Sequence, residues 1–170
     1  MDRKSFLKQN ILLGGVAAIA PNMLIASNAV ATQEEVFDQD LILEFVFAAH
    51  KSLDETQKIL EKHPLLLNCT SQFKKGDFET AVGGASHMGR KDIVDYLVGK
   101  GARLDIFNYA FLGFDGFIKK MVATYPQLLN SYGPHGFTLL HHAEVGKHKE
   151  LAEWLQSKGL TDKIFKGVFG

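Results

Sequence analysis

Apolar residues recur at helical spacing in two stretches of the chain that share one layout. In the first stretch, four of them stand at positions i, i+1, i+4 and i+5: Ile93, Val94, Leu97 and Val98. The second stretch repeats the pattern with Leu151, Trp154 and Leu155. Such spacing places the apolar side chains on one face of a helix. A shorter helical pattern precedes each stretch, so the sequence predicts pairs of short antiparallel helices.

The shorter helix of each pair has its own start and stop signals. A threonine, Thr80 or Thr138, stands where a hydroxyl can cap the free backbone N–H groups of the first turn. An alanine five residues later lets two helices approach closely. We expect Gly89 and Gly146 to end these helices, because glycine adopts the left-handed conformation without strain.

Two weaker copies of the pattern complete a set of four. They lie at residues 40–64 and 105–130, and each stops before a proline. The segments 62–68 and 124–130 also match each other nearly position for position. A single repeat cannot cover its own apolar face, but three or more stacked repeats can. The sequence therefore predicts an all-α solenoid with four repeats, at residues 38–70, 71–104, 105–134 and 135–160.

The repeats resemble those of the ankyrin family. Residues 138–143, Thr-Leu-Leu-His-His-Ala, are similar to the Thr-Pro-Leu-His-x-Ala signature, with Leu139 replacing the proline. Residues 79–107 and the turn at 133–136 resemble an exported bacterial subgroup. The resemblance implies an ankyrin repeat scaffold that binds another protein and has neither catalytic residues nor a cofactor. The second repeat departs from the signature at Gly83 and Gly84, where a second backbone or a ligand could approach closely.

Residues 1–31 have the layout of an export signal. A basic start with Arg3, Lys4 and Lys8 precedes an apolar run of about ten residues, which is too short to span a bilayer. Small residues follow it, and we expect cleavage after Ala29 or Ala31. The start resembles the twin-arginine translocation signal with a lysine in place of the second arginine. We therefore expect a periplasmic or otherwise exported bacterial protein; an uncleaved membrane anchor is the alternative.

Charge and cysteine content exclude several other classes of protein. The chain of 170 residues has 19 basic and 19 acidic residues, so no net charge draws it to nucleic acid or to an anionic membrane. Cys69 is the only cysteine, which excludes an intrachain disulfide and a cysteine-based zinc site. We expect a monomer whose partner is another protein, with residues 161–170 forming a capping tail.

Aromatic and histidine side chains of the turns and first helices are the candidate contacts of that partner. We expect Phe114 and Phe117 to pack between repeats. Tyr109 and Phe111 are candidates for an exposed patch, although the favoured interpretation is that the aromatic run fills space in a shortened repeat. The complete set of candidates is Phe73, Phe78, His87, Tyr109, Phe111, Tyr132, His135 and His142.

Histidines offer an alternative function. His87, His135 and His142 could converge on the concave face and bind a metal ion or a small molecule, with or without catalysis. His141 and His142 are adjacent and point about 100° apart on a helix, so they cannot share one ion. His141 stands at the signature position, where a backbone hydrogen bond is expected. The sequence contains no HExxH, CxxC or phosphate-binding glycine loop, and binding of a protein without catalysis is the leading prediction.

Overall fold

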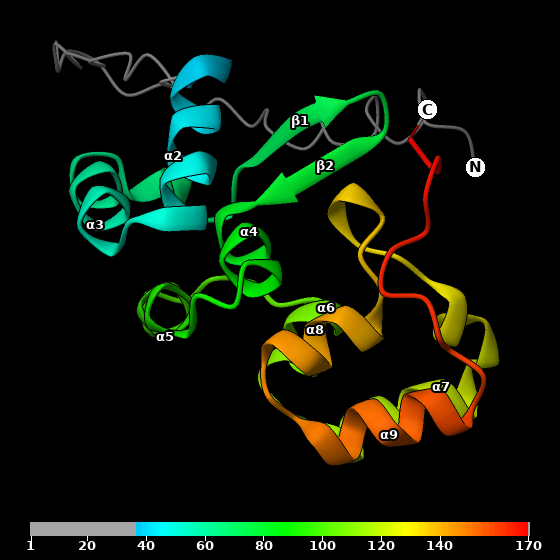
Figure 1. The fold of residues 1–170 in the computed structure, drawn as a ribbon. Coiled ribbons are helices and arrows are strands. Elements are labelled where there is room, and N and C mark those ends of the chain that lie inside the picture. The colour runs from blue at the N-terminus through cyan, green and yellow to red at the C-terminus, as the bar shows by residue number, and fades with distance from the viewer. Residues whose placement is uncertain (1–36, 170) are drawn as a thin grey trace, which may run out of the picture. The chain divides into compact units, whose positions relative to one another are not determined.

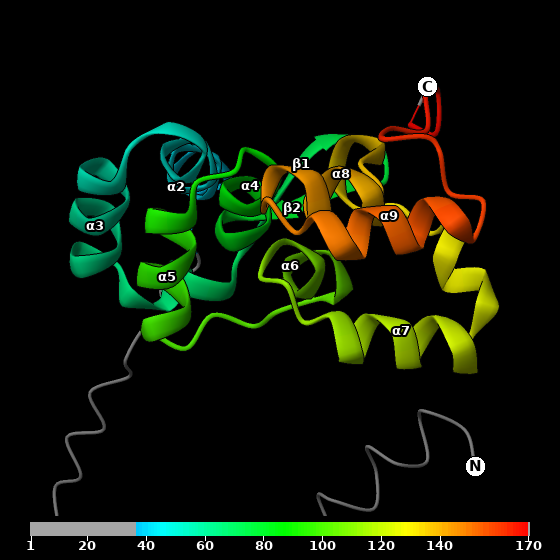
Figure 2. The same ribbon diagram turned by 60° about the horizontal axis from the view of Figure 1, so that its bottom comes forward.

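The computed structural model describes residues 37–169 (Figures 1 and 2). The predicted export signal at residues 1–31 lies outside the described residues. Among the residues described, no helix is long and apolar enough to cross a membrane.

Helices follow one another in pairs along the chain. Four of them, α2, α4, α6 and α8, contact one another in that order, and each packs against the helix that follows it (Figure 2). The helices are α2 (Gln39–Lys51), α3 (Leu53–Lys62), α4 (Ala81–His87), α5 (Lys91–Gly99), α6 (Ile106–Phe111), α7 (Asp115–Thr124), α8 (Leu139–Val145) and α9 (Lys149–Ser157). Short 3-10 turns are η1 (Pro64–Asn68), η2 (Pro126–Asn130) and η3 (Pro134–Gly136).

The prediction of an all-α ankyrin repeat solenoid is wrong. Strands β1 (Thr70–Lys74) and β2 (Asp77–Thr80) pair into a two-stranded antiparallel sheet within the second predicted repeat. The helices are also irregular, from 13 residues in α2 to 6 in α6. Strand β2 was not predicted because its alternation of polar and apolar residues is reversed: Asp77 and Glu79 are buried, whereas Phe78 is 54% exposed. A half-buried strand normally points its apolar residues inward, so this pattern does not read as a strand.

The start signals of the short helices are confirmed, and α8 ends at Gly146 as expected, but the predicted left-handed conformation of Gly146 is wrong. Thr80 accepts a hydrogen bond from the Gly83 amide at 3.1 Å and Thr138 one from the His141 amide at 3.4 Å. Gly89 has the expected left-handed conformation, with φ of 72°. After α8, however, Lys147 is the left-handed residue. Gly146 is needed because a Cβ there would collide with the Phe111 carbonyl oxygen.

Two apolar clusters form the core, one around α2–α5 and one around α6–α9. Phe111 belongs to the first cluster and is only 2% exposed, so its assignment as a candidate for an exposed patch is wrong. Phe114 and Phe117 are exposed instead of packing between helix pairs. Phe111 lies on the inner face of the short helix α6, whereas Phe114 caps the start of α7 and points outward.

Candidate metal centre

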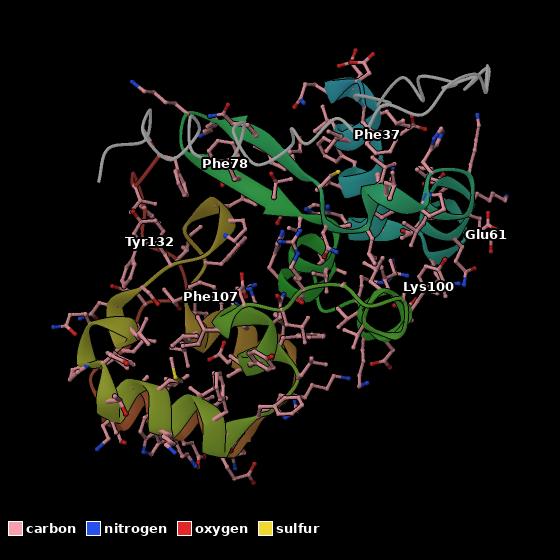
Figure 3. All side chains as sticks on the ribbon, turned by 180° about the vertical axis from the view of Figure 1, so that it is seen from behind. Phe37, Glu61, Phe78, Lys100, Phe107 and Tyr132 are labelled. Atoms are coloured by element: carbon pink, nitrogen blue, oxygen red, sulfur yellow. The ribbon has the colours of Figure 1, made fainter. Side chains whose placement is uncertain are left out.

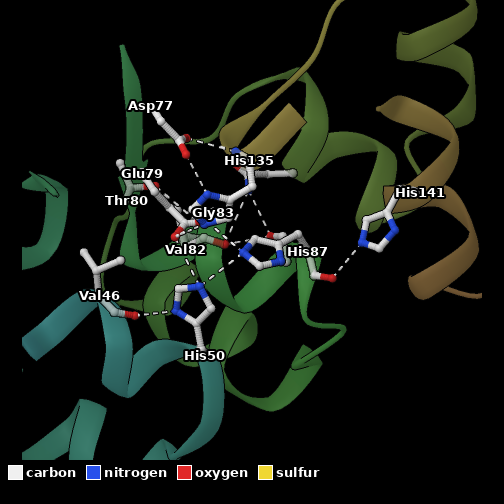
Figure 4. Close-up of polar contacts among 12 residues, drawn as sticks. Val46, His50, Asp77, Glu79, Thr80, Val82, Gly83, His87, His135 and His141 are labelled. Atoms are coloured by element: carbon white, nitrogen blue, oxygen red, sulfur yellow. Dashed lines mark hydrogen bonds and ion pairs between the residues drawn. The ribbon is translucent and has the colours of Figure 1, made fainter. Parts of the chain in front are cut away.

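Four ionisable side chains meet where α2, the β1–β2 hairpin, α4 and η3 come together (Figure 4). His50 lies in the last turn of α2, Glu79 on the buried face of β2, His87 at the end of α4 and His135 in η3. One ligand atom from each side chain lies within 4.8 Å of all the others. The donors thus come from three stretches that are distant in sequence: residue 50, residues 79–87 and residue 135.

The Glu79 carboxylate occupies the middle of this cluster and is almost completely buried, at 1% exposed. Its Oε1 lies 2.8 Å from His87 Nε2, and its Oε2 lies 3.2 Å from His50 Nε2 and 3.3 Å from His135 Nε2. His50 Nε2 and His87 Nε2 are 3.2 Å apart. Ligands bound at about 2.0–2.1 Å to a tetrahedral ion are separated by about 3.3 Å. The spacings of 3.2–3.3 Å therefore fit neighbouring ligands of one ion, whereas the 2.8 Å between Glu79 Oε1 and His87 Nε2 is a hydrogen-bond distance.

The carboxylate oxygens lie within ion-pair distance of all three imidazoles, but their hydrogen-bond geometry is poor. Both are buried, and neither makes a hydrogen bond of acceptable geometry within the described residues, although histidine nitrogens lie close. An unsatisfied buried carboxylate is costly, and such a group in a folded protein calls for a missing partner. Nitrogen and oxygen donors that gather around one buried point are typical of a metal site, and here His87 Nε2 and His50 Nε2 also lie within hydrogen-bond distance of each other, at 3.2 Å.

Two of the three imidazoles are oriented through their other ring nitrogen. His50 Nδ1 lies 2.8 Å from the Val46 carbonyl oxygen, and His135 Nδ1 lies 2.8 Å from Asp77 Oδ2. A proton held on Nδ1 by such an acceptor leaves the Nε2 lone pair free for a metal. His87 differs, because its buried Nδ1 has no partner within the described residues.

Glycine at position 84 makes room for the His50 ring. A Cβ at this position would lie 2.6 Å from His50 Cε1, which is too close for any side chain. The departure of Gly84 from the ankyrin signature thus has a local cause. Helix α4 lacks a side chain here, and the imidazole from α2 can lie directly against its backbone to reach Glu79.

The cluster is electrostatically biased towards a bound cation. Burial alone would raise the pKa of Glu79, but the adjacent His50 and His87 rings outweigh it and lower that pKa to about 2. Burial lowers the pKa of His50. The Glu79 carboxylate and the Val46 carbonyl raise it by a larger amount, so the net effect is an increase. Glu79 therefore remains a carboxylate, and a positive charge beside it is favourable.

Aromatic rings wall the cluster on two sides. The Phe73 ring lies 4.9 Å from the His135 ring, and the Phe137 ring stacks on His87 at 4.9 Å. Phe73 reaches this place because the pairing of β1 with β2 is irregular between Gln72 and Lys74, and such a bulge re-aims a side chain. These rings lower the local dielectric and strengthen the interaction between a cation and its ligands.

The structure brings together only some of the predicted site residues. His87 and His135 join the cluster and Phe73 lines it, whereas His142 is 1% exposed and donates from Nδ1 to the Thr138 carbonyl at 2.8 Å. The prediction that His142 converges with them is therefore wrong. Buried His87, Phe111 and His142 present little surface to a partner, and Tyr109 is half-buried against Phe117. Phe78 and Tyr132 are exposed (Figure 3).

His50 and Glu79 were missing from the sequence prediction. Glu79 was missed because the segment before Thr80 was interpreted as a turn between helix pairs, and His50 because it stands at the end of a helix pattern. The departure at Gly83 and Gly84 was the usable signal, because it indicated close approach of another group. The predicted backbone role of His141 is confirmed, since its Nε2 lies 2.8 Å from the His87 carbonyl oxygen.

Comparison with known proteins gives no independent assignment. No protein-family model matches the chain, and the search of curated proteins found no match either. The function must therefore be inferred from the site.

Proposed function

We propose that the protein binds one divalent transition-metal ion through His50, Glu79, His87 and His135. The single observation that carries this proposal is the convergence of three imidazole nitrogens on one buried carboxylate, at 2.8–3.3 Å from its oxygens. Three nitrogens and one oxygen suit Zn²⁺, Cu²⁺, Fe²⁺ or Ni²⁺ better than Ca²⁺ or Mg²⁺, which prefer oxygen ligands. The proposal is a binding function and assigns no reaction.

A metal ion resolves the cost of burying this cluster. Glu79 carries a negative charge although its side chain is almost completely buried, with the partly exposed His50 and His135 on its outer side. A dication bound by the carboxylate and three neutral imidazoles supplies the compensating charge and uses every Nε2 lone pair. The competing explanation is a polar network without metal, in which a proton on His50 supplies the charge.

Metal analysis of protein purified without an affinity tag distinguishes the two explanations. We expect about one equivalent of metal per chain after dialysis against Zn²⁺, Co²⁺, Ni²⁺ or Cu²⁺, and loss of that equivalent in Glu79→Gln and His87→Ala. His63→Ala is the matched control, because His63 lies at the end of α3 and its ring contacts Phe37 instead of the cluster. Less than a tenth of an equivalent in the wild type for every metal would overturn the proposal.

Protein binding is the second candidate function, and exposed aromatic side chains favour it. Phe78 on the hairpin and Tyr132 on the loop after η2 both project from the surface (Figure 3). Exposed aromatic rings are frequent anchors of protein interfaces. A pull-down from envelope extract with the wild type and with Phe78→Ala plus Tyr132→Ala tests it; an unchanged set of recovered proteins would remove these residues from consideration. Export to the periplasm remains a proposal that depends on residues 1–31.

A further inference from the structure

The segment that follows α9 returns to the turn that carries His135. The Thr138 amide donates to the Lys163 carbonyl at 3.0 Å, and the Phe165 amide donates to the Gly136 carbonyl at 2.9 Å. The Thr138 hydroxyl donates to the Asp162 carbonyl at 2.7 Å. Phe137 and Ile164 form an isolated antiparallel bridge between these contacts. We call residues 162–165 the strap.

The turn held by the strap has a strained backbone. His135 has φ of 59° and the next residue, Gly136, has φ of 85°. The left-handed conformation is uncommon for a residue with a side chain, and it persists only where the surroundings impose it. A Cβ at Gly136 would lie 2.7 Å from the Phe165 carbonyl oxygen, so strap and turn are in close contact.

Two different elements therefore hold His135 in place. Asp77 of β2 binds its backbone N–H and its ring, and the strap binds the residues directly after it. Nothing in the strap supplies a metal ligand, because its side chains lie outside the donor cluster. Its contacts act on the backbone of Gly136 and Thr138, which determine where the His135 imidazole points.

We propose that the strap is a positioning element of the metal centre, so that docking of the C-terminal segment and occupancy of the metal site are coupled. The inference rests on the proposed metal-binding function. Coupling between two sites is reciprocal: a docked strap raises metal affinity by the same factor by which bound metal favours docking. Outer-shell groups that orient a ligand are typically worth about 10- to 100-fold in metal affinity, and we expect an effect of that size.

Two truncated chains test the first half of the coupling. One ends at Thr161 and lacks the strap, and the control ends at Lys166 and keeps it. We expect the metal dissociation constant, measured by competition with a chromophoric chelator, to rise about 10- to 100-fold in the shorter chain and to change less than twofold in the control. The visible spectrum of bound Co²⁺ should also change in the shorter chain, because loss of one imidazole alters the coordination geometry.

Hydrogen exchange of the full chain tests the second half and needs no variant that could fail to fold. We expect metal to slow exchange of the Thr138 and Phe165 amides at least tenfold, whereas the Lys100 amide at the end of α5 should keep its rate. Unchanged rates for Thr138 and Phe165 with metal bound, or an unchanged dissociation constant in the folded shorter chain, would overturn the inference. Failure of the wild type to bind any metal is a separate result, which would overturn the proposed function itself.

Discussion

The Asp77 carboxylate binds His135 twice. Its Oδ1 accepts a hydrogen bond from the His135 backbone N–H at 2.9 Å, and its Oδ2 lies 2.8 Å from His135 Nδ1. The two residues are 58 positions apart in the chain. One side chain thus fixes both the left-handed backbone of His135 and the tautomer of its ring, which directs Nε2 towards Glu79.

Asp77→Asn should weaken metal binding while leaving all four proposed ligands in place. The amide oxygen can replace only one of the two acceptors, and the amide NH₂ group opposes a donating Nδ1–H. We expect about 10- to 100-fold weaker binding and about 1–3 kcal/mol less stability, since a buried donor loses its acceptor. Competition with a chelator and urea unfolding measure the two effects. Asp54→Asn, which removes an exposed carboxylate paired with Lys58 on α3, should leave metal binding unchanged and cost less than about 1 kcal/mol of stability.

Gly84→Ala should disturb the cluster by steric overlap with the His50 ring, without changing any charge. The added Cβ would lie 2.6 Å from His50 Cε1, and the ring or helix α4 must move. Overpacking of this kind typically costs about 1–3 kcal/mol. We expect a lower free energy of unfolding in urea together with weaker metal binding.

Gly99→Ala is the matched control for that variant. It adds the same methyl group near the end of α5, where no heavy atom lies within 4 Å. Alanine favours the helix by about 0.5–1 kcal/mol over glycine, so this variant should be unchanged or slightly more stable. Equal effects of the two substitutions would contradict the assigned role of Gly84.

Local signals in the sequence predicted much of the helical structure, because they act within a few residues. Thr80 and Thr138 cap their own helices. On α5, Ile93, Val94 and Leu97 are buried as their spacing indicates, whereas Val98, predicted on the same face, is 37% exposed. These features depend on contacts at i+3 and i+4, which a linear sequence displays directly.

The hairpin and the candidate site depend on contacts that the sequence does not display. Glu79 and Asp77 lie on the buried face of β2, where they form ion pairs with histidines distant in the chain. The hydrophobic pattern alone gives no sign of those partners. His50 joins the cluster from α2, separated from His87 by 37 residues. The prediction of helix pairs joined by turns also left no place for a strand directly before Thr80.

Substitutions of Phe111 and Phe114 test which of these two aromatic side chains is buried. Phe111 packs in the first core cluster, whereas Phe114 is 51% exposed at the start of α7. We expect Phe111→Ala to lower the free energy of unfolding by about 3–5 kcal/mol, and Phe114→Ala by less than about 1 kcal/mol. Chemical denaturation followed by circular dichroism measures both. A larger loss for Phe114→Ala would mean that the assignment of the two rings is reversed.

His142 should make the protein less stable in acid. Burial holds its imidazole neutral and lowers its pKa to about 3, compared with an ordinary value of 6.5. Between these two values the unfolded chain binds a proton that the folded chain does not, so the free energy of unfolding falls as the pH is lowered through this window. The difference between pH 7 and pH 4.5 corresponds to about 2–3 kcal/mol.

His142→Asn isolates this effect from that of the other acidic and basic groups. The Asn amide can replace Nδ1 as the donor to the Thr138 carbonyl but does not titrate. We expect the variant to be less stable than the wild type at pH 7 and to lose this disadvantage progressively as the pH falls to 4.5. Urea unfolding of both proteins at several pH values gives the two curves. Parallel curves over this range would show that His142 does not titrate differently in the folded and unfolded chains, and its burial would then have no part in acid instability.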